Sequence, residues 1–305
     1  MKLKSTTTAP ALIIAVMLLL AVSRHFDLGQ LSYHENICLA VIVLQILILF
    51  VPAAFYMRLH DGKIDSGSGD NFVSRLRLKP FGLEKLLATG LAALTIVSGT
   101  VLLKLLMFSV GAIDGEYSVW RSFLVGNETN VVYSLLTFCV IPSIAEEILF
   151  RGVLCVEYEG NGALTAVLLS SGLYAMFGLN FGYFPIIFFA GLGYALVYYM
   201  TRTLFAPIIC HLLVSAIELM IDETVWNIIT KPHSTVFLIF ALVAIFLLCL
   251  ASLFSECERL YFGYSLRNLS SDEIGRQSAG GFLKALLAPP YLLAALLYIV
   301  AVIGF

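Results

Sequence analysis

Charge is what this sequence has least of. Only 12% of its 305 residues are charged, whereas about 25% is usual for a soluble globular protein. Hydrophobic residues make up 60% of the chain, and the mean hydropathy is +0.95. This balance excludes a soluble globular domain and predicts an integral membrane protein in a lipid bilayer. The formal net charge of −2 and the pI of about 6.2 give no basis for nucleic-acid binding.

The sequence also lacks paired cysteines and internal repeats. None of its six cysteines belongs to a C-x-x-C pair, and most of them lie in or beside apolar segments. We therefore predict reduced cysteines that pack as small apolar side chains. Neither a disulfide framework nor a cysteine-based zinc site is expected.

Long apolar runs are the main feature that is present. A membrane-spanning helix needs roughly 20 mostly apolar residues, and by this rule the sequence contains about nine candidates. They are Ala9–Val22, Ile37–Met57, Leu86–Val110, Val131–Gly152, Ala163–Leu179, Phe184–Met200, Leu204–Met220, Thr235–Phe254 and Leu286–Phe305. We predict an all-α, polytopic transmembrane helix bundle with about eight or nine spans.

The distribution of Lys and Arg predicts the orientation of the bundle. Cytoplasmic loops of membrane proteins carry an excess of these residues. With a cytoplasmic N-terminus, most of them fall inside: Lys2, Lys4, Arg58, Lys63, Arg75, Arg77, Lys79, Lys85, Arg202, Arg259, Arg267, Arg276 and Lys284. Arg24, Arg121 and Lys231 fall outside. We therefore expect a cytoplasmic N-terminus, an external C-terminus, and long cytoplasmic loops at Arg58–Lys85 and Ser255–Lys284.

Charged side chains interrupt the fourth apolar run, in the segment SIAEEILFRG. Ionisable residues within a membrane helix are costly and commonly functional. Glu147 and Arg151 are four residues apart with the acid first, which is the favourable order for an intrahelical ion pair. Glu146 points about 100° away around the helix and is expected to be unpaired, as suits a proton-handling group. Glu157 and Glu159 are interpreted as solvated loop charges.

A histidine interrupts the seventh apolar run. His211, in PIICHLLVSAIE, lies about 10 Å from the cytoplasmic edge, and Glu146 lies about 9 Å from it, at 1.5 Å per residue. Ser215 and Glu218 follow at positions i+4 and i+7, so this helix has one polar face. We expect Glu146 and His211 to face each other in a cavity open to the cytoplasm. The alternative for His211 alone is a structural hydrogen-bonding role.

These segments resemble a known family. EEILFRG resembles the E-E-x-x-x-R motif of the CPBP family, also called the abortive-infection family, which comprises CAAX prenyl endopeptidases and bacteriocin-processing intramembrane proteases. FFAGLGYALVYYMTRTLFAPIICHLLVSAIE is similar to its third motif, and LLSSGLYAMFGL has the spacing of its second. The resemblance covers roughly Val131 to Glu218. It implies a CPBP-like core at residues 131–220, between N-terminal transmembrane helices with a long cytoplasmic loop (1–130) and C-terminal transmembrane helices (221–305).

The resemblance implies roles for five residues. Glu146 would be the general base that activates a water molecule, and His211 would donate a hydrogen bond to the oxyanion. Glu147 and Arg151 would support the site. Ser215 stands where the family has asparagine, and its hydroxyl can still donate a hydrogen bond. No cofactor is required by this glutamate mechanism, although a divalent metal such as zinc remains open because some family members are described as metalloproteases.

One position departs more seriously from the family pattern. The histidine of the second motif falls on Gly178, which has no side chain, and the phenylalanine four residues earlier falls on Tyr174. Tyr174 and Asn180 are the two residues considered as substitutes for the missing histidine.

Three functions are compatible with these residues. The first is an intramembrane endopeptidase of a bacterial cell membrane, which hydrolyses a membrane-associated peptide or protein at the cytoplasmic side. The second is a catalytically impaired family member that acts as a membrane scaffold, regulator or immunity protein, which Gly178 favours. The third is a transporter with Glu146 or Glu218 as a proton relay, which the absence of internal repeats disfavours.

Overall fold

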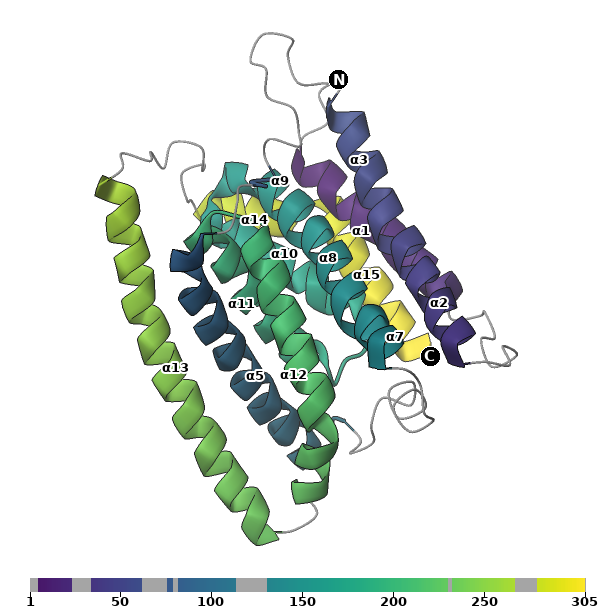
Figure 1. Cartoon of the computed structure of the whole chain (residues 1–305). Helices are drawn as coiled ribbons and strands as arrows, with labels where there is room; N and C mark the ends of the chain where they lie inside the picture. Colours follow the sequence, from purple (N-terminus) through teal and green to yellow (C-terminus); the bar gives the residue numbers. More distant parts are fainter. Residues whose placement is uncertain are drawn as a thin grey trace.

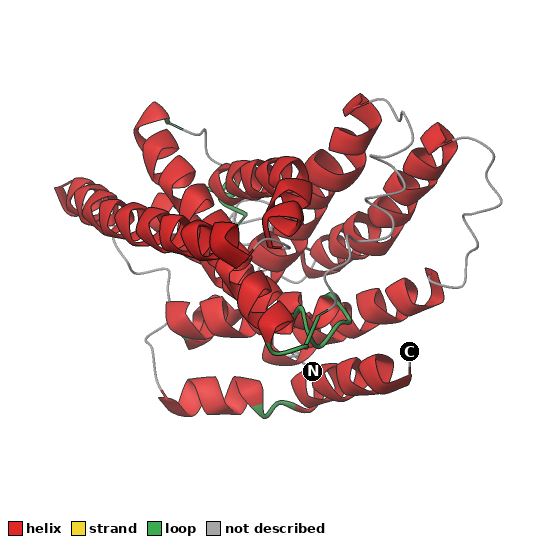
Figure 2. Ribbon diagram, turned by 90° about the horizontal axis from the view of Figure 1, so that it is seen from below, coloured by secondary structure: helices red, strands yellow, loops and turns green. Residues whose placement is uncertain are grey.

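The computed structural model describes residues 5–23, 34–61, 76–78, 82–113, 131–229, 232–266 and 279–304. Within these ranges every regular element is a helix and none is a strand (Figure 2). The all-α prediction is therefore confirmed. Helices are the expected outcome of long apolar runs, because a helix satisfies its backbone hydrogen bonds within the segment and needs no water to do so.

In the described part of the chain, each apolar range predicted from the sequence is helical over most of its length. The elements are α1 (Ser5–Ser23), α2 (His34–Gln45), η2 (Ile46–Phe50), α3 (Val51–Asp61), η3 (Leu83–Lys85), α5 (Leu86–Ser109), α7 (Val131–Leu135), η4 (Leu136–Val140), α8 (Ile141–Glu147), η5 (Ile148–Cys155), α9 (Val156–Tyr158), η6 (Glu159–Asn161), α10 (Ala163–Phe177), α11 (Phe184–Thr201), α12 (Phe205–Ile229), α13 (Pro232–Leu266), α14 (Ala279–Leu286) and α15 (Pro289–Gly304). Successive long helices run in opposite directions through the bundle (Figure 1).

Fewer of these helices meet the length expected of a membrane span. Within the described ranges, four are long and apolar enough: Glu35–Leu59, Leu83–Ser109, Phe184–Thr201 and Ser234–Tyr261. A fifth results if α14 and α15, which meet at a bend of 50°, form one span. Apolar segments in α1, α10 and α12 are shorter, at 10–17 residues. The described residues thus contain four or five candidate spans, and the count of eight or nine stays a prediction.

The helices that carry the sequence motifs lie together within the bundle. α10 packs on α11 and on η5, and α12 packs on α5, α11 and α8. By contrast, α13 packs mainly on α5 and stands at the edge of the bundle (Figure 1). Its apolar 18-residue window is 0% buried, which is typical of a helix whose partner is lipid.

Glycines allow α11 to approach its neighbours closely. A Cβ atom at Gly191 would lie 2.9 Å from Cδ1 of Tyr174 on α10, and one at Gly193 would lie 2.5 Å from Cδ1 of Ile96 on α5. Small residues at helix contacts are the usual means by which membrane helices pack closely. Gly191 therefore sets how near Tyr174 lies to the α11 backbone.

The helix that carries the charged segment is irregular. The π-helical segments η4 and η5 flank α8, on which Glu146 and Glu147 lie. π-helical turns are rare and occur frequently at functional sites. The Gln45 side chain, at the end of α2, donates a hydrogen bond from Nε2 to the Thr137 carbonyl in η4 at 3.1 Å. This bond ties the irregular segment to the N-terminal helices.

The six cysteines are free, as predicted. Cys38, Cys139, Cys155 and Cys210 are buried. Cys155 Sγ lies 3.1 Å from the Ser170 hydroxyl, between η5 and α10. These side chains act as small residues in the packing of the bundle.

Candidate active site

Glu147 and Arg151 form a fully buried ion pair. Arg151 Nη1 donates a hydrogen bond to Glu147 Oε1 at 3.1 Å, and both side chains are 0% exposed. Arg151 Nη2 also donates to the main-chain carbonyl of Gly191 at 2.7 Å. A buried charge is tolerated where it is both paired and hydrogen-bonded. The predicted intrahelical pair is present, and the same guanidinium joins η5 to α11.

His211 joins this pair from α12. Its Nδ1 lies 3.0 Å from Glu147 Oε1, the oxygen that also accepts from Arg151. Because an ionised carboxylate only accepts hydrogen bonds, His211 Nδ1 must carry the proton and donate it. The other ring nitrogen, Nε2, takes no part in this hydrogen bond.

Nε2 of His211 faces Glu146. The distance from Nε2 to Glu146 Oε2 is 3.9 Å, which is too long for a direct hydrogen bond. The Glu146 side chain is 16% exposed and that of His211 is 7% exposed. Glu146 takes no part in the Glu147–Arg151 pair, as expected, and faces His211 instead.

Aromatic rings enclose these polar groups. The Tyr194 ring stacks on the His211 imidazole with centroids 4.5 Å apart at 16°, and the Tyr174 ring meets it edge-on at 6.3 Å. The Arg151 guanidinium lies 4.8 Å from the Tyr174 ring centroid and 5.4 Å from that of Tyr194. These contacts add cation–π attraction and exclude water from the ion pair. Electrostatic interactions are stronger where water is excluded.

Helix α10 brings Tyr174 to the site. Gly178 is the C-cap residue of this helix, and Asn180 lies beyond it, exposed, with its side chain accepting a hydrogen bond from the Tyr183 backbone N–H. Of the two residues considered as substitutes for the missing histidine, Tyr174 is the one at the site, where its ring packs against Arg151 and His211.

This geometry agrees with a comparison with known families. The family model described as type II CAAX prenyl endopeptidase Rce1-like matches residues 128–217. Residues 128–217 are Rce1-like. The match confirms the resemblance predicted from the motifs, and it covers less than a third of the chain. No curated protein and no solved structure matches the chain. The Rce1-like segment and the apolar helices together indicate an integral membrane protein.

Ser215 is the one predicted site residue of the Rce1-like segment that stands apart from the others. It lies one turn beyond His211 on α12 and is partly buried. Among the described residues, no hydrogen bond joins it to Glu146, Glu147, Arg151 or His211. Its assignment as the counterpart of the family asparagine therefore stays a prediction.

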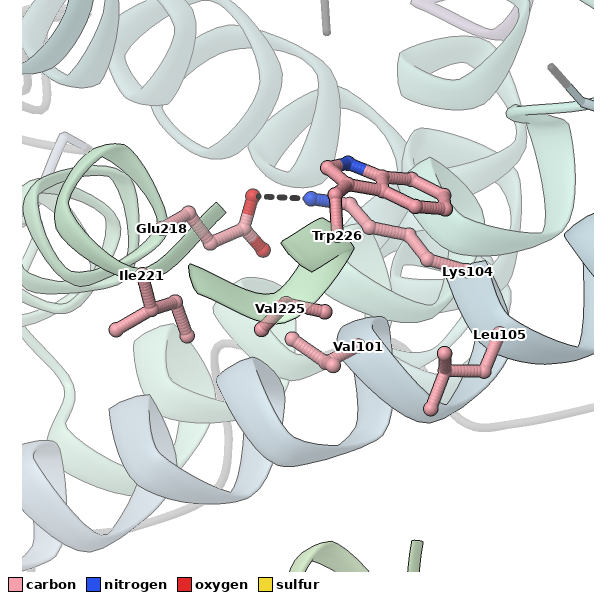
Figure 3. A pocket seen from close by; sticks show the side chains of 7 residues that line it. All are labelled: Val101, Lys104, Leu105, Glu218, Ile221, Val225 and Trp226. Carbon is pink, nitrogen blue, oxygen red and sulfur yellow. Dashed lines mark hydrogen bonds and ion pairs between the residues drawn. The ribbon is translucent and has the colours of Figure 1, made fainter. Parts of the chain in front are cut away.

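Glu218, just outside the Rce1-like segment, belongs to a different cluster. Its carboxylate accepts hydrogen bonds from Thr100 Oγ1 at 2.8 Å and from Lys104 Nζ at 3.1 Å, both on α5. The pair lines a small pocket beside Trp226 (Figure 3). The polar face of α12 is thus shared between the site around His211 and an ion pair to α5, which sequence reasoning missed because Lys104 is on another helix.

A turn of the first long loop packs at the edge of the Rce1-like segment. Glu157 and Glu159 were predicted to be solvated, yet each is 8% exposed. Arg77 Nη2 lies 3.1 Å from Glu159 Oε1, and the guanidinium lies 5.1 Å from the Tyr198 ring centroid. The Arg77 carbonyl accepts a hydrogen bond from the Leu204 N–H at 3.2 Å. The prediction for the two glutamates was wrong: both are buried, and Arg77 packs against Glu159.

A divalent metal was left open by the sequence, and the geometry of the described residues bears on it. In the ranges that the structure describes, no group of three or more His, Cys, Asp or Glu side chains could hold a metal ion. The donors that face each other at the candidate site are one imidazole nitrogen and one carboxylate, His211 Nε2 and Glu146.

Proposed function

We propose that this chain is an intramembrane endopeptidase in which Glu146 activates a water molecule for attack on a peptide bond. The observation that carries the proposal is the 3.9 Å gap between Glu146 Oε2 and His211 Nε2. A carboxylate and an imidazole that face each other in an aromatic surround form an acid–base pair within reach of one water. The Rce1-like match supports the same reading.

The proposed reaction balances with these residues alone. Glu146 takes a proton from water as the water oxygen bonds to the carbonyl carbon of the substrate. The resulting oxyanion accepts a hydrogen bond from Nε2–H of protonated His211, whose Nδ1–H stays bonded to Glu147. Glu146 then returns the proton to the amide nitrogen as the C–N bond breaks. The products are a carboxylic acid and an amine.

The buried ion pair would serve this reaction by holding His211. Glu147 Oε1 receives hydrogen bonds from both Arg151 and His211, so it fixes the direction of the imidazole. Arg151 is in turn anchored to Gly191 on α11. A second group that orients the acid–base residue is the general arrangement of such sites.

The substrate class and the membrane orientation that we propose are inferred from the sequence. The substrate would be a membrane-associated peptide or protein, cleaved at the cytoplasmic side of a bacterial cell membrane. The core would comprise residues 131–220, within eight or nine spans and with a cytoplasmic N-terminus. The excess of Lys and Arg in the loops expected inside supports this orientation.

Glu146→Gln in protein reconstituted into liposomes tests the proposal, with a fluorescent prenylated CAAX peptide and its unprenylated form as probes. Loss of the general base is expected to lower the cleavage rate by about 10²- to 10⁴-fold. Glu256→Gln is the matched control, because Glu256 lies on α13 in an exposed pair with Arg259. Cleavage that survives Glu146→Gln would overturn the assignment of the base.

A second function is favoured by Gly178, which leaves the second motif without its histidine. In this alternative the chain binds a membrane peptide without cleaving it and acts as a scaffold, regulator or immunity protein. Binding of the prenylated peptide by wild-type protein, with no cleavage over a long incubation, would support this alternative over the endopeptidase.

A further inference from the structure

The hydrogen bond to Glu147 fixes one edge of the His211 imidazole. Nδ1 lies 3.0 Å from Glu147 Oε1, while Nε2 faces Glu146 Oε2 at 3.9 Å. The χ2 torsion of a histidine has a broad energy minimum, so a hydrogen bond at one ring nitrogen leaves the plane of the ring free to tilt about that nitrogen. A tilt changes the direction of Nε2 relative to Glu146. A contact on the face of the ring is needed to hold its plane.

Tyr194 of α11 makes that contact. Its ring stacks on the imidazole of His211, with centroids 4.5 Å apart and planes within 16° of parallel. The Tyr174 ring meets the same imidazole edge-on, at 6.3 Å and 84°. Two flat rings packed face against face cannot tilt independently without van der Waals overlap. The stacked ring therefore restricts the motion that the hydrogen bond to Glu147 permits.

Tyr194 is itself held in place. It is 2% exposed, and the Arg151 guanidinium lies 5.4 Å from its ring centroid. The backbone of α11 is fixed on both sides of it: Arg151 Nη2 donates to the Gly191 carbonyl at 2.7 Å, and a Cβ at Gly193 would lie 2.5 Å from Cδ1 of Ile96. A side chain that is packed and anchored in this way can hold a functional group in one orientation.

We infer that Tyr194 is a positioning residue for His211, whose stacked ring fixes the plane of the imidazole and with it the direction of Nε2. The inference rests on the proposed function, in which His211 donates a hydrogen bond to the oxyanion. Tyr194 acts through His211, and the property that matters is the flat ring rather than the hydroxyl. The orientation of the imidazole can be measured without any substrate.

Kinetics of two variants in liposomes separate the ring from the hydroxyl. Tyr194→Phe keeps a flat ring, whereas Tyr194→Leu fills much of the space without one. With the prenylated CAAX peptide, kcat is expected to stay near the wild-type value in Tyr194→Phe. It is expected to fall about 10- to 100-fold in Tyr194→Leu, the effect of a misplaced catalytic group, while KM is unchanged. Tyr298→Leu is the matched control, because Tyr298 is also buried, at 6% exposed, and its hydroxyl donates to the Asn180 carbonyl.

NMR of protein labelled with ¹³C-histidine, in detergent micelles, measures the orientation of the imidazole. The Hε1 signal of His211 is identified as the signal lost in His211→Gln. It is expected to be single and sharp in wild type, in Tyr194→Phe and in Tyr298→Leu. In Tyr194→Leu it is expected to broaden or to split, because the imidazole then exchanges among several orientations. If Tyr194→Leu does not fold, Tyr194→Met takes its place with the same expected results, since its flexible side chain adapts to irregular space and has no flat face.

The outcomes separate this inference from the proposed function. A single sharp His211 signal in the folded variant without the ring overturns the inference, whatever the activity. A broadened signal with unchanged kcat also overturns it, and so does an equal loss of kcat in Tyr194→Phe and Tyr194→Leu. A broadened signal and a reduced kcat at unchanged KM, both confined to the variant without the ring, support it. If the wild-type protein cleaves neither peptide, the proposed endopeptidase fails, and a signal broadened only in that variant still supports Tyr194 as the residue that orients His211.

Discussion

Arg151 and Gly191 are joined by a 2.7 Å hydrogen bond from a guanidinium to a main-chain carbonyl in the middle of another helix. The bond spans 40 residues of sequence. The planar guanidinium fork lets Arg151 donate to Gly191 and Glu147 at once. The compact ammonium of a lysine is less suited to bonding two groups in different directions. Arg151 therefore balances the charge of Glu147 and also connects η5 to α11.

Removing the guanidinium is expected to destabilise the protein strongly. Arg151→Met leaves Glu147 as a buried charge balanced only by His211, and breaking a buried pair in this way costs about 3–5 kcal/mol. Thermal unfolding in detergent measures the loss. The double variant Glu147→Leu/Arg151→Met removes both charges and should recover most of the stability, because an apolar pair can replace a buried ion pair. A double variant as unstable as the single one would contradict this account.

The ion pair between Arg77 and Glu159 is expected to contribute more to the stability of the fold than an ordinary surface ion pair does. Its side chains are 14% and 11% exposed, so Arg77→Ala should cost about 1–3 kcal/mol, the range for removing one partner of a buried polar contact. Arg259→Ala is the comparison, since that arginine is 53% exposed in its pair with Glu256 and should cost at most about 1 kcal/mol. Equal costs in unfolding experiments would show that the Arg77 turn does not hold the helix ends together.

Much of the fold could be predicted because helices in a membrane need long apolar runs, and these are visible in a single sequence. The matching depths of Glu146 and His211 follow from the same simple geometry, a rise of about 1.5 Å per residue. The partners of Glu159 and Glu218 could not be found in this way. Arg77 and Lys104 lie on other elements, and which residues meet across helices depends on packing details such as Gly191.

Gly191→Ala is expected to disturb both packing and the site. The new Cβ would lie 2.9 Å from Tyr174 Cδ1 and 3.2 Å from Ser171 Cβ, and overpacking of this kind costs about 1–3 kcal/mol. Gly90→Ala on α5 is the matched control, because a Cβ there meets nothing within 4 Å. That change should be neutral or stabilising by about 0.5–1 kcal/mol, the helical advantage of alanine over glycine. If both variants unfold at the same temperature as wild type, the close approach of α10 and α11 is not required.

The last prediction concerns restoring the side chain that Gly178 lacks. Gly178→His alone places its Cβ 2.5 Å from Ile187 Cδ1, and the strain is expected to cost about 1–3 kcal/mol. Ile187→Ala removes the obstructing atom, so Gly178→His/Ile187→Ala should fold better than Gly178→His does. With the prenylated CAAX peptide, this pair of changes should raise kcat above that of wild type, because an imidazole at position 178 supplies the polar side chain that the second motif lacks. Ile187→Ala alone is the control for changes in packing. The same kcat with and without the histidine, in stably folded proteins, would show that position 178 has no access to the site.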